Sequence, residues 1–174
     1  GPEATSVGTE VFLFPVAAIT EKSGSLTNTE RLVQWHEQAI DPPGDCRSDL
    51  WYVYQLGKRL KKLYAGSTLP RDEQILNLTW EYEYDAAPGG TSRSGDPDPE
   101  KVLREINGYN VATGAHLKGP AELAGDGSTA CGSRLYSGVF PAPDQNLSKR
   151  LDHAIVGTGI FADWGWAWPG NTRV

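Results

Sequence analysis

The first apolar run of the chain, in residues 9–18, is nearly continuous. It consists of β-branched, aromatic and leucine side chains: Val11, Phe12, Leu13, Phe14 and Val16. Such a run is typical of a strand that is buried on both faces of a sheet. The polar residues 21–28 follow it and contain Gly24, so they predict a loop at the carboxyl end of that strand. In α/β sheets, ligands tend to bind at this end of the strands.

Residues 32–40 alternate loosely between apolar and polar side chains, which predicts a short strand before the Pro-Pro-Gly stop at 42–44. The clearest helix is predicted next, because apolar side chains recur every three or four residues. These side chains are Leu50, Val53, Leu56, Leu60 and Leu63. Asp45 or Ser48 can cap the start of this helix, and Gly66 can end it. We expect its apolar face to pack on the sheet that holds residues 11–14.

Two shorter helices are predicted at prolines. Pro70 starts one of them, and two acidic residues follow it in the first turn. Asp98 as the cap and Pro99 as the first helical residue start the other, which is expected to end at Gly108. Residues 85–98 are rich in Pro, Gly, Ser and Asp and predict a loop or linker.

These elements predict a mixed α and β (α/β) fold, with a small sheet, packing helices and a long irregular C-terminal half. We divide the chain into a strand-loop-strand-helix unit at 3–84, the loop or linker at 85–98, and a loop-rich continuation at 99–174 with one helix. The continuation ends in a tail with Trp164, Trp166 and Trp168, and rings this dense are expected to pack against another surface. Residues 1–2, Gly-Pro, resemble the scar of an engineered protease site, and the chain has no Met, so we expect an expressed fragment.

Charge and composition argue against several classes of function. The 174 residues carry a formal net charge of -6, whereas nucleic-acid binding needs a basic surface, so we expect no nucleic-acid partner. The longest apolar run is far shorter than the roughly 20 residues of a bilayer-spanning helix, so we expect no direct membrane insertion. Cys46 and Cys131 are far apart and belong to no paired motif. The sequence therefore predicts no metal site.

Two motif fragments are better explained without a ligand. Residues 157–162 match the dinucleotide fingerprint G-x-G-x-x-A, but the Trp- and Pro-containing residues 163–170 cannot form the helix that the pyrophosphate needs. His36 and Glu37 begin an H-E-x-x-H pattern whose second histidine position is occupied by Ile40. We interpret His36 as a strand or interface residue. The residues alone identify no catalytic group.

Three stretches carry a family resemblance: TEVFLFP at 9–15, EKSGSLTNTERLVQWH at 21–36, and DPPGDCRSDLW at 41–51. Together they resemble one region of the large (alpha) subunit of formate dehydrogenase, in the molybdopterin oxidoreductase family. Residues 72–80, 125–138 and 166–174 resemble its continuation in the long, membrane-complex type. The resemblance implies an internal fragment of such a subunit, with residues 3–84 in a molybdopterin-binding domain of a larger fold.

The resemblance also implies a reaction for the parent enzyme. That reaction is the oxidation of formate to CO2 at molybdenum or tungsten, held by two molybdopterin guanine dinucleotides, with a 4Fe-4S cluster in the same subunit. The motifs that hold the metal and the cluster are not in this chain, so we expect it to have no catalytic residue and to be inactive alone. The implied partners are the rest of the large subunit and an iron–sulfur electron-transfer subunit. The implied location of the parent is the periplasm.

The same resemblance implies that the loop after the first strand lies near a pterin dinucleotide. The cofactor-binding residues that it implies are Glu21, Gly24, Ser25, Asn28 and Arg31. Ser and Asn can hydrogen bond to pterin or phosphate edges, glycine permits close backbone approach, and Arg pairs with phosphate. The alternative is ordinary turn chemistry after a strand.

A hypothesis of another class treats the chain as an interaction module. It would dock on a partner subunit or a maturation factor, with the tryptophan tail at 164–168 as its anchor. Apolar surface that lacks its neighbours could also be covered by a dimer of the chain.

Overall fold

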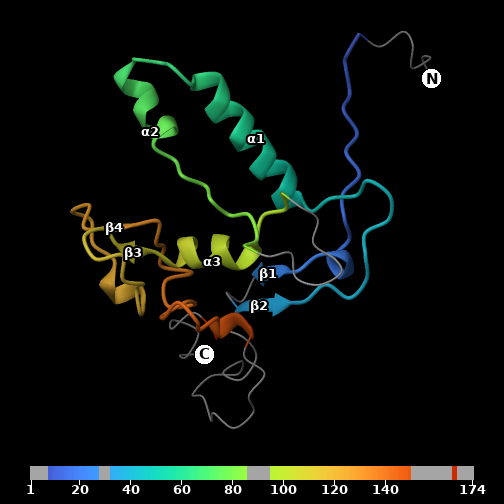
Figure 1. The fold of residues 1–174 in the computed structure, drawn as a ribbon. Helices are drawn as coiled ribbons and strands as arrows, with labels where there is room; N and C mark the ends of the chain where they lie inside the picture. The colour runs from blue at the N-terminus through green and yellow to red at the C-terminus, as the bar shows by residue number, and fades with distance from the viewer. Residues whose placement is uncertain (1–7, 28–31, 86–94, 150–165, 168–174) are drawn as a thin grey trace.

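The structure, a computed structural model, describes residues 8–27, 32–85, 95–149 and 166–167 (Figure 1). A three-stranded antiparallel sheet has the order β1-β2-β5, formed by β1 (Gly24–Thr27), β2 (Leu32–His36) and β5 (Trp166–Ala167). A two-stranded sheet joins β3 (Tyr109–Asn110) to β4 (Thr129–Ala130). The α-helices are α1 (Asp49–Tyr64), α2 (Glu73–Leu76) and α3 (Pro99–Asn107). The expected mixed α and β fold is confirmed.

Local capping signals place the two longer helices. The Ser48 side chain accepts a hydrogen bond from the backbone N–H of Trp51 at 3.1 Å and starts α1. The Asp98 carboxylate accepts one from the N–H of Glu100 at 2.8 Å and starts α3, with Pro99 as its first residue. Gly108 ends α3 at a φ of +84°, a conformation that favours glycine. These predicted helix boundaries are confirmed.

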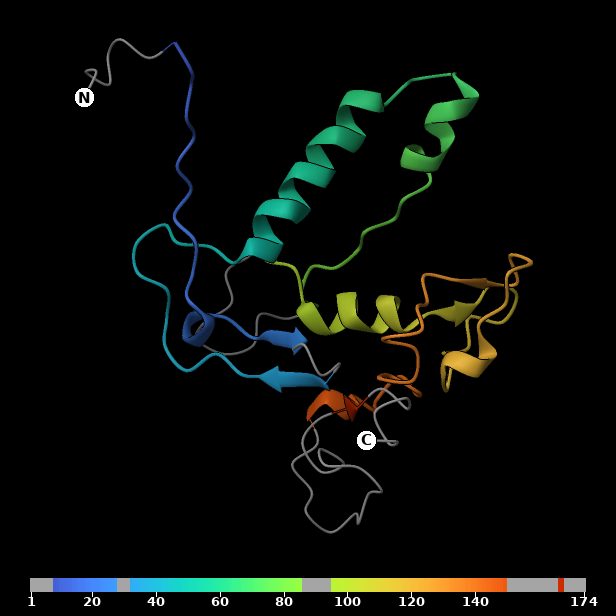
Figure 2. The same ribbon diagram turned by 180° about the vertical axis from the view of Figure 1, so that it is seen from behind.

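The core lies where α3, the three-stranded sheet and the C-terminal loops meet. Its buried members are Val33, Leu103, Val139, Phe140 and Trp166. Val33 on β2 and Phe140 are almost completely shielded from solvent. Figure 2 shows the same arrangement from behind, with α3 running beside the β1–β2 hairpin and α1 and α2 projecting away from both sheets. Apart from the first turn of α1, the helical pair formed by α1 and α2 is therefore distant from this core.

The prediction of helix α1 is confirmed, but the prediction that its apolar face is buried is wrong. Val53 and Leu63 are 68% and 80% exposed, and Leu56 and Leu60 are exposed as well. The inward face instead carries Tyr54 and Gly57, which pack on the extended segment 78–83. Periodicity identifies an apolar stripe but does not identify what covers it, and no described residue buries this stripe.

The predicted buried strand at residues 11–14 is also wrong. These residues form no regular element, and Leu13 is 94% exposed. Backbone hydrogen bonds to the rest of the chain begin at Pro15, whose carbonyl accepts from the Tyr52 hydroxyl and the Arg47 N–H. No described strand pairs with residues 11–14, and a strand needs partners for its backbone groups.

Two further sequence predictions are corrected at the three-stranded sheet. Residues 24–27 were expected in a loop, but they form β1 because they pair with β2 over four residues, from Gly24 opposite His36 to Thr27 opposite Val33. Trp166 was expected in an anchor for a partner, but it is 7% exposed and pairs with Val33 inside the chain's own core. The other two tryptophans of the tail, and the fingerprint at 157–162, lie outside the described residues.

Candidate functional site

A cavity of about 230 Å³ lies between the start of β1, the end of β2, the first turn of α1 and one face of α3. Its rim is polar and its wall on α3 is apolar, an arrangement that is typical of small-molecule sites. The polar lining comes from Lys22, Ser23, Gly24, Ser25, His36 and Asp49, and the apolar lining from Leu50, Pro99, Val102, Leu103 and Ile106. Capping fixes this geometry, because Ser48 and Asp98 set where the two helices begin.

An ion pair and a serine hydroxyl hold the rim together. The Lys22 ammonium lies 2.7 Å from the Asp49 carboxylate and joins the chain before β1 to the first turn of α1. The Ser23 hydroxyl donates to the Glu37 carboxylate at 3.1 Å and accepts from the Gln38 N–H at 2.9 Å. The two ends of the β1–β2 hairpin are thereby linked on the side that faces the cavity.

The structure brings together two of the five residues for which a cofactor role was expected. Gly24 and Ser25 both line the cavity. Glu21 does not line it, because its carboxylate accepts a hydrogen bond from the Ala18 N–H at 2.8 Å within its own 3₁₀ turn. Asn28 and Arg31 lie outside the described residues. The cofactor role of these residues stays a prediction.

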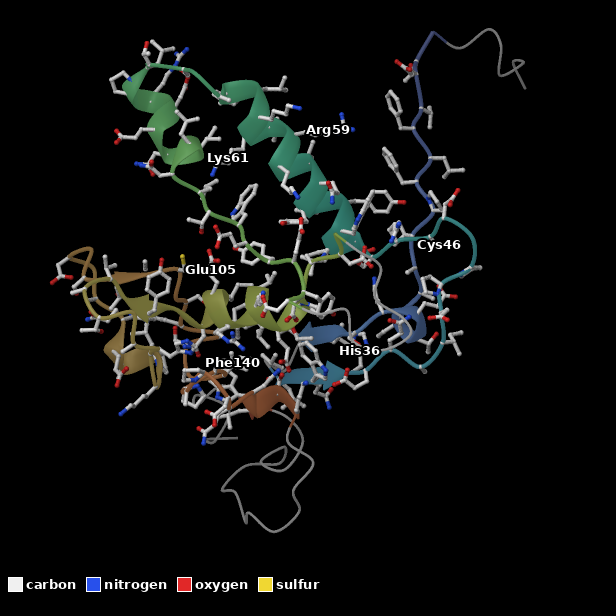
Figure 3. The ribbon with its side chains drawn as sticks, viewed as in Figure 1. His36, Cys46, Arg59, Lys61, Glu105 and Phe140 are labelled. Carbon is white, nitrogen blue, oxygen red and sulfur yellow. The ribbon has the colours of Figure 1, made fainter. Side chains whose placement is uncertain are left out.

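Sequence reasoning missed several residues of the cavity. His36 was interpreted as a strand or interface residue, and it lies at the end of β2 beside the cavity (Figure 3). Lys22 and Asp49 are distant in sequence and become neighbours only through the fold. The one available signal was the apolar periodicity of α3, which places Val102 and Ile106 on one face.

A charged cluster supports β2 beside this site. The Trp35 indole N–H donates to the Glu37 carboxylate at 2.7 Å, and the Lys149 ammonium lies 3.3 Å from the same carboxylate. Lys149 also pairs with Glu100 on α3 and lies 4.7 Å from the centre of the Trp35 ring. Partial burial acts to raise the pKa of Glu37, but the Trp35 hydrogen bond and the Lys149 charge outweigh it and lower that pKa.

This cluster predicts an acid-sensitive stabilisation. The pKa of Glu37 lies below its ordinary value of 4.5. The contribution of Glu37 to the free energy of unfolding is therefore present above pH 4.5 and is lost as the pH falls through the pKa of the folded state. We expect Glu37→Gln to have a lower Tm than the wild type at neutral pH, and the difference to disappear in acid well below pH 4.5. Thermal unfolding of both proteins at neutral and at acid pH measures this difference in Tm. An equal difference at both pH values would contradict the assignment.

The described residues limit the chemistry of the site. Within the described ranges, no group of three or more His, Cys, Asp or Glu side chains could hold a metal ion. Nor does any helix in those ranges have the length and apolar character needed to cross a membrane. The arrangement offers hydrogen-bond donors, one ammonium group and an apolar wall, which together suit binding of a polar organic molecule.

Comparison with known proteins identifies the relationship. Residues 12–59, which contain β1, β2 and most of α1, match the model of the molybdopterin oxidoreductase family. Over 99% of its length the chain is 34% identical to the formate dehydrogenase-O major subunit of Escherichia coli. The chain belongs to the molybdopterin oxidoreductase family.

Further relatives of this molybdopterin oxidoreductase chain are similar along its whole length. It is 33% identical over 100% of its length to formate dehydrogenase 2 subunit alpha (cytochrome c-553) of Nitratidesulfovibrio vulgaris. It is 29% identical over 97% of its length to the formate dehydrogenase major subunit of Haemophilus influenzae. The chain spans only 17% of the length of each of these relatives.

Proposed function

We propose that the chain is a structural and cofactor-cradling region of the large subunit of a molybdenum or tungsten bis-pterin formate dehydrogenase. In the whole protein the reaction would be oxidation of formate to CO2. The observation that carries the proposal is the similarity to formate dehydrogenase major and alpha subunits over nearly the entire chain. The chain by itself would be inactive, because it supplies a share of the cradle and no reacting group.

The lining of the cavity fits part of a pterin dinucleotide. A Cβ added at Gly24 would meet only the His36 imidazole, at 3.8 Å, so the backbone there is open to close approach by a ligand. The exposed Ser25 hydroxyl and the Lys22 ammonium can donate hydrogen bonds to pterin or phosphate oxygens. At about 230 Å³ the cavity is small for a whole dinucleotide, so it would hold one part of the cofactor.

When bound, the cofactor would supply the metal that accepts electrons from formate. The roles of this chain would be to orient and to bind. Gly24 gives the ligand access to the β1 backbone, Ser25 donates a hydrogen bond, and the Lys22–Asp49 pair fixes the rim. The parent would also carry a 4Fe-4S cluster, work with an iron–sulfur electron-transfer subunit, and lie in the periplasm.

A direct test uses the purified 174-residue chain. We expect no formate-dependent reduction of a viologen dye, either with or without added molybdopterin cofactor. A formate dehydrogenase assayed under the same conditions is the positive control. Turnover by the chain alone would overturn the proposal that it is a non-catalytic region.

Exposed apolar surface favours a second candidate function, docking on another polypeptide. Residues 11–14 and the outer stripe of α1 are both apolar and exposed. Phe14 packs against Tyr52 of α1, with ring centroids 5.2 Å apart, so the two surfaces are adjacent. Large exposed apolar patches mark interaction sites. The partner would be the rest of the large subunit, a partner subunit or a maturation factor, and the isolated chain could form a dimer instead.

The docking surface predicts self-association of the isolated chain. We expect the double variant Leu13→Ser, Leu60→Ser to self-associate less than the wild type, because both side chains are exposed apolar members of this surface. Sedimentation velocity over a range of concentrations measures the effect. Val111→Ser is the matched control, since Val111 is 56% exposed but lies on the turn after β3. A monomeric wild type would contradict self-association of the isolated chain, and an equal effect of the control would contradict this surface as its site.

A further inference from the structure

A second cavity, of about 360 Å³, lies on the far side of α3 from the β1–β2 hairpin. It is formed by the extended segment before residue 83, by α3, and by the β3 region. Its lining residues are Thr79, Glu81, Tyr82, Lys101, Arg104, Glu105, Tyr109, Gly114 and His116. None of them belongs to the candidate cofactor site, so a ligand bound in this cavity would be independent of the proposed function.

Arg104 lines this cavity and has an unmet hydrogen-bonding group beneath its surface. Its Nε atom is shielded from solvent and has no hydrogen-bond partner. No other side-chain nitrogen or oxygen in the described part of the chain combines these two properties. The guanidinium lies 5.1 Å from the centre of the Phe140 ring, which fixes its plane. Because an arginine side chain cannot lose its proton in a protein, this donor requires an acceptor.

The charged neighbours of Arg104 are already engaged. Glu105 accepts hydrogen bonds from the Tyr82 hydroxyl and, at 3.6 Å, from the Cys131 thiol. The Lys101 ammonium donates to the Glu83 carbonyl and to the Asp85 carboxylate, each at 2.7 Å. Figure 3 shows Glu105 and Phe140 on opposite sides of α3. The buried group that lacks a partner is therefore a donor, and an occupant that satisfies it must bring an acceptor.

The local histidine does not supply that acceptor. The Nδ1 atom of His116 lies 2.9 Å from the Phe140 carbonyl, which can only accept, so Nδ1 carries the proton and Nε2 of the neutral ring is an acceptor. The hydrogen bond from Nδ1 holds the imidazole against Phe140. Arg104 Nε nevertheless makes no hydrogen bond to Nε2. In the structure, no described residue accepts a hydrogen bond from Arg104 Nε.

We propose that this cavity binds a carboxylate group through the guanidinium of Arg104. An anion suits the site because the Arg104 guanidinium, which lines the cavity, forms no ion pair with any described residue. Glu81 and Glu105 also line the cavity and repel negative charge. A singly charged carboxylate is repelled less than a doubly charged phosphate, so the carboxylate is preferred.

The test titrates sodium acetate into the chain at constant ionic strength and follows the Arg104 Nε–H signal by NMR. Shielding from solvent slows exchange of this proton, so its signal should be observable. We expect a saturable shift with half-saturation on the order of 10 mM, because one guanidinium contact gives weak affinity. Inorganic phosphate in a parallel titration should saturate at a several-fold higher concentration.

Matched variants identify the signal and the site. Arg104→Lys keeps the charge but removes the Nε–H, so it assigns the resonance. Arg59→Gln makes a comparable change at an exposed arginine of α1, and should leave the acetate shift unchanged. Absence of saturation with acetate in the wild type would overturn the proposal. So would tighter binding of phosphate, or loss of the shift in Arg59→Gln.

Discussion

Replacing Asn107 with alanine is expected to destabilise the chain by roughly 4 kcal/mol or more, since four buried hydrogen bonds of its side chain are lost. The amide nitrogen donates to the carbonyls of Gly108 and Leu117, each at 3.0 Å. The amide oxygen accepts from the N–H groups of Gly138 and Phe140, each at 2.8 Å. Asn107 is fully buried, so water cannot replace these bonds. A loss of this size is a large share of the ~5–15 kcal/mol that stabilise most domains.

Asn110 is the matched control for this prediction. Its amide oxygen accepts hydrogen bonds from the N–H groups of Ala112 and Thr113, but in an exposed turn. Water can satisfy those N–H groups after substitution, so Asn110→Ala should cost at most about 1 kcal/mol. Urea unfolding of both variants measures the difference. Similar midpoints for the two variants would show that Asn107 does not organise the loops after α3.

Gly57→Ala is expected to destabilise the attachment of α1 by about 2 kcal/mol, although alanine is the better helix former by about 1 kcal/mol. The reason is a steric overlap, because a Cβ at this position would lie 1.9 Å from Cζ3 of the Trp80 ring. Trp80 has little freedom to move, since its φ is +46° and its carbonyl accepts a hydrogen bond from the Tyr54 hydroxyl. Thermal unfolding followed by tryptophan fluorescence measures the effect.

A double variant separates the overlap from helix propensity. In the Trp80→Leu background the ring is absent, so Gly57→Ala should become neutral or stabilising. The two substitutions are thus expected to be strongly non-additive, as is usual for side chains in contact. Additive effects would show that Gly57 matters for some reason other than its contact with Trp80.

Local chemistry predicted the helices, whereas tertiary partners decided what they bury. Ser48 and Asp98 are followed directly by the turns that they cap, so the information lies within a few residues. The outward direction of Leu60 could not be predicted in this way. It depends on Trp80, which fills the space beside Gly57 and turns that face of α1 inward.

The strands also depend on tertiary partners that the local sequence does not reveal. Residues 11–14 have strong strand composition but no described strand beside them, and they remain exposed. Residues 24–27 have turn composition, yet they pair with β2 along their whole length. Strand propensity depends on context, because the neighbouring strand supplies much of the stabilisation.

The candidate site was predictable only in part. Gly24 and Ser25 were singled out from the family resemblance, and both line the cavity. Glu21 came from the same reasoning but forms a local hydrogen bond to Ala18. The opposite wall, on α3, comes from residues about 75 positions later, and only the three-dimensional fold brings it to β1.

The most direct test of the cofactor-cradle proposal is the cofactor content of the Gly24→Phe variant of the whole large subunit. The nearest atom to a Cβ at Gly24 is 3.8 Å away, so the fold should accept the substitution while the ring enters the cavity. Gly125→Phe is the control, because a Cβ there meets nothing within 4 Å and Gly125 does not line the cavity. We predict that Gly24→Phe loses most of its bound metal and pterin, and that Gly125→Phe keeps both. Full metal and pterin content in Gly24→Phe would contradict the proposal.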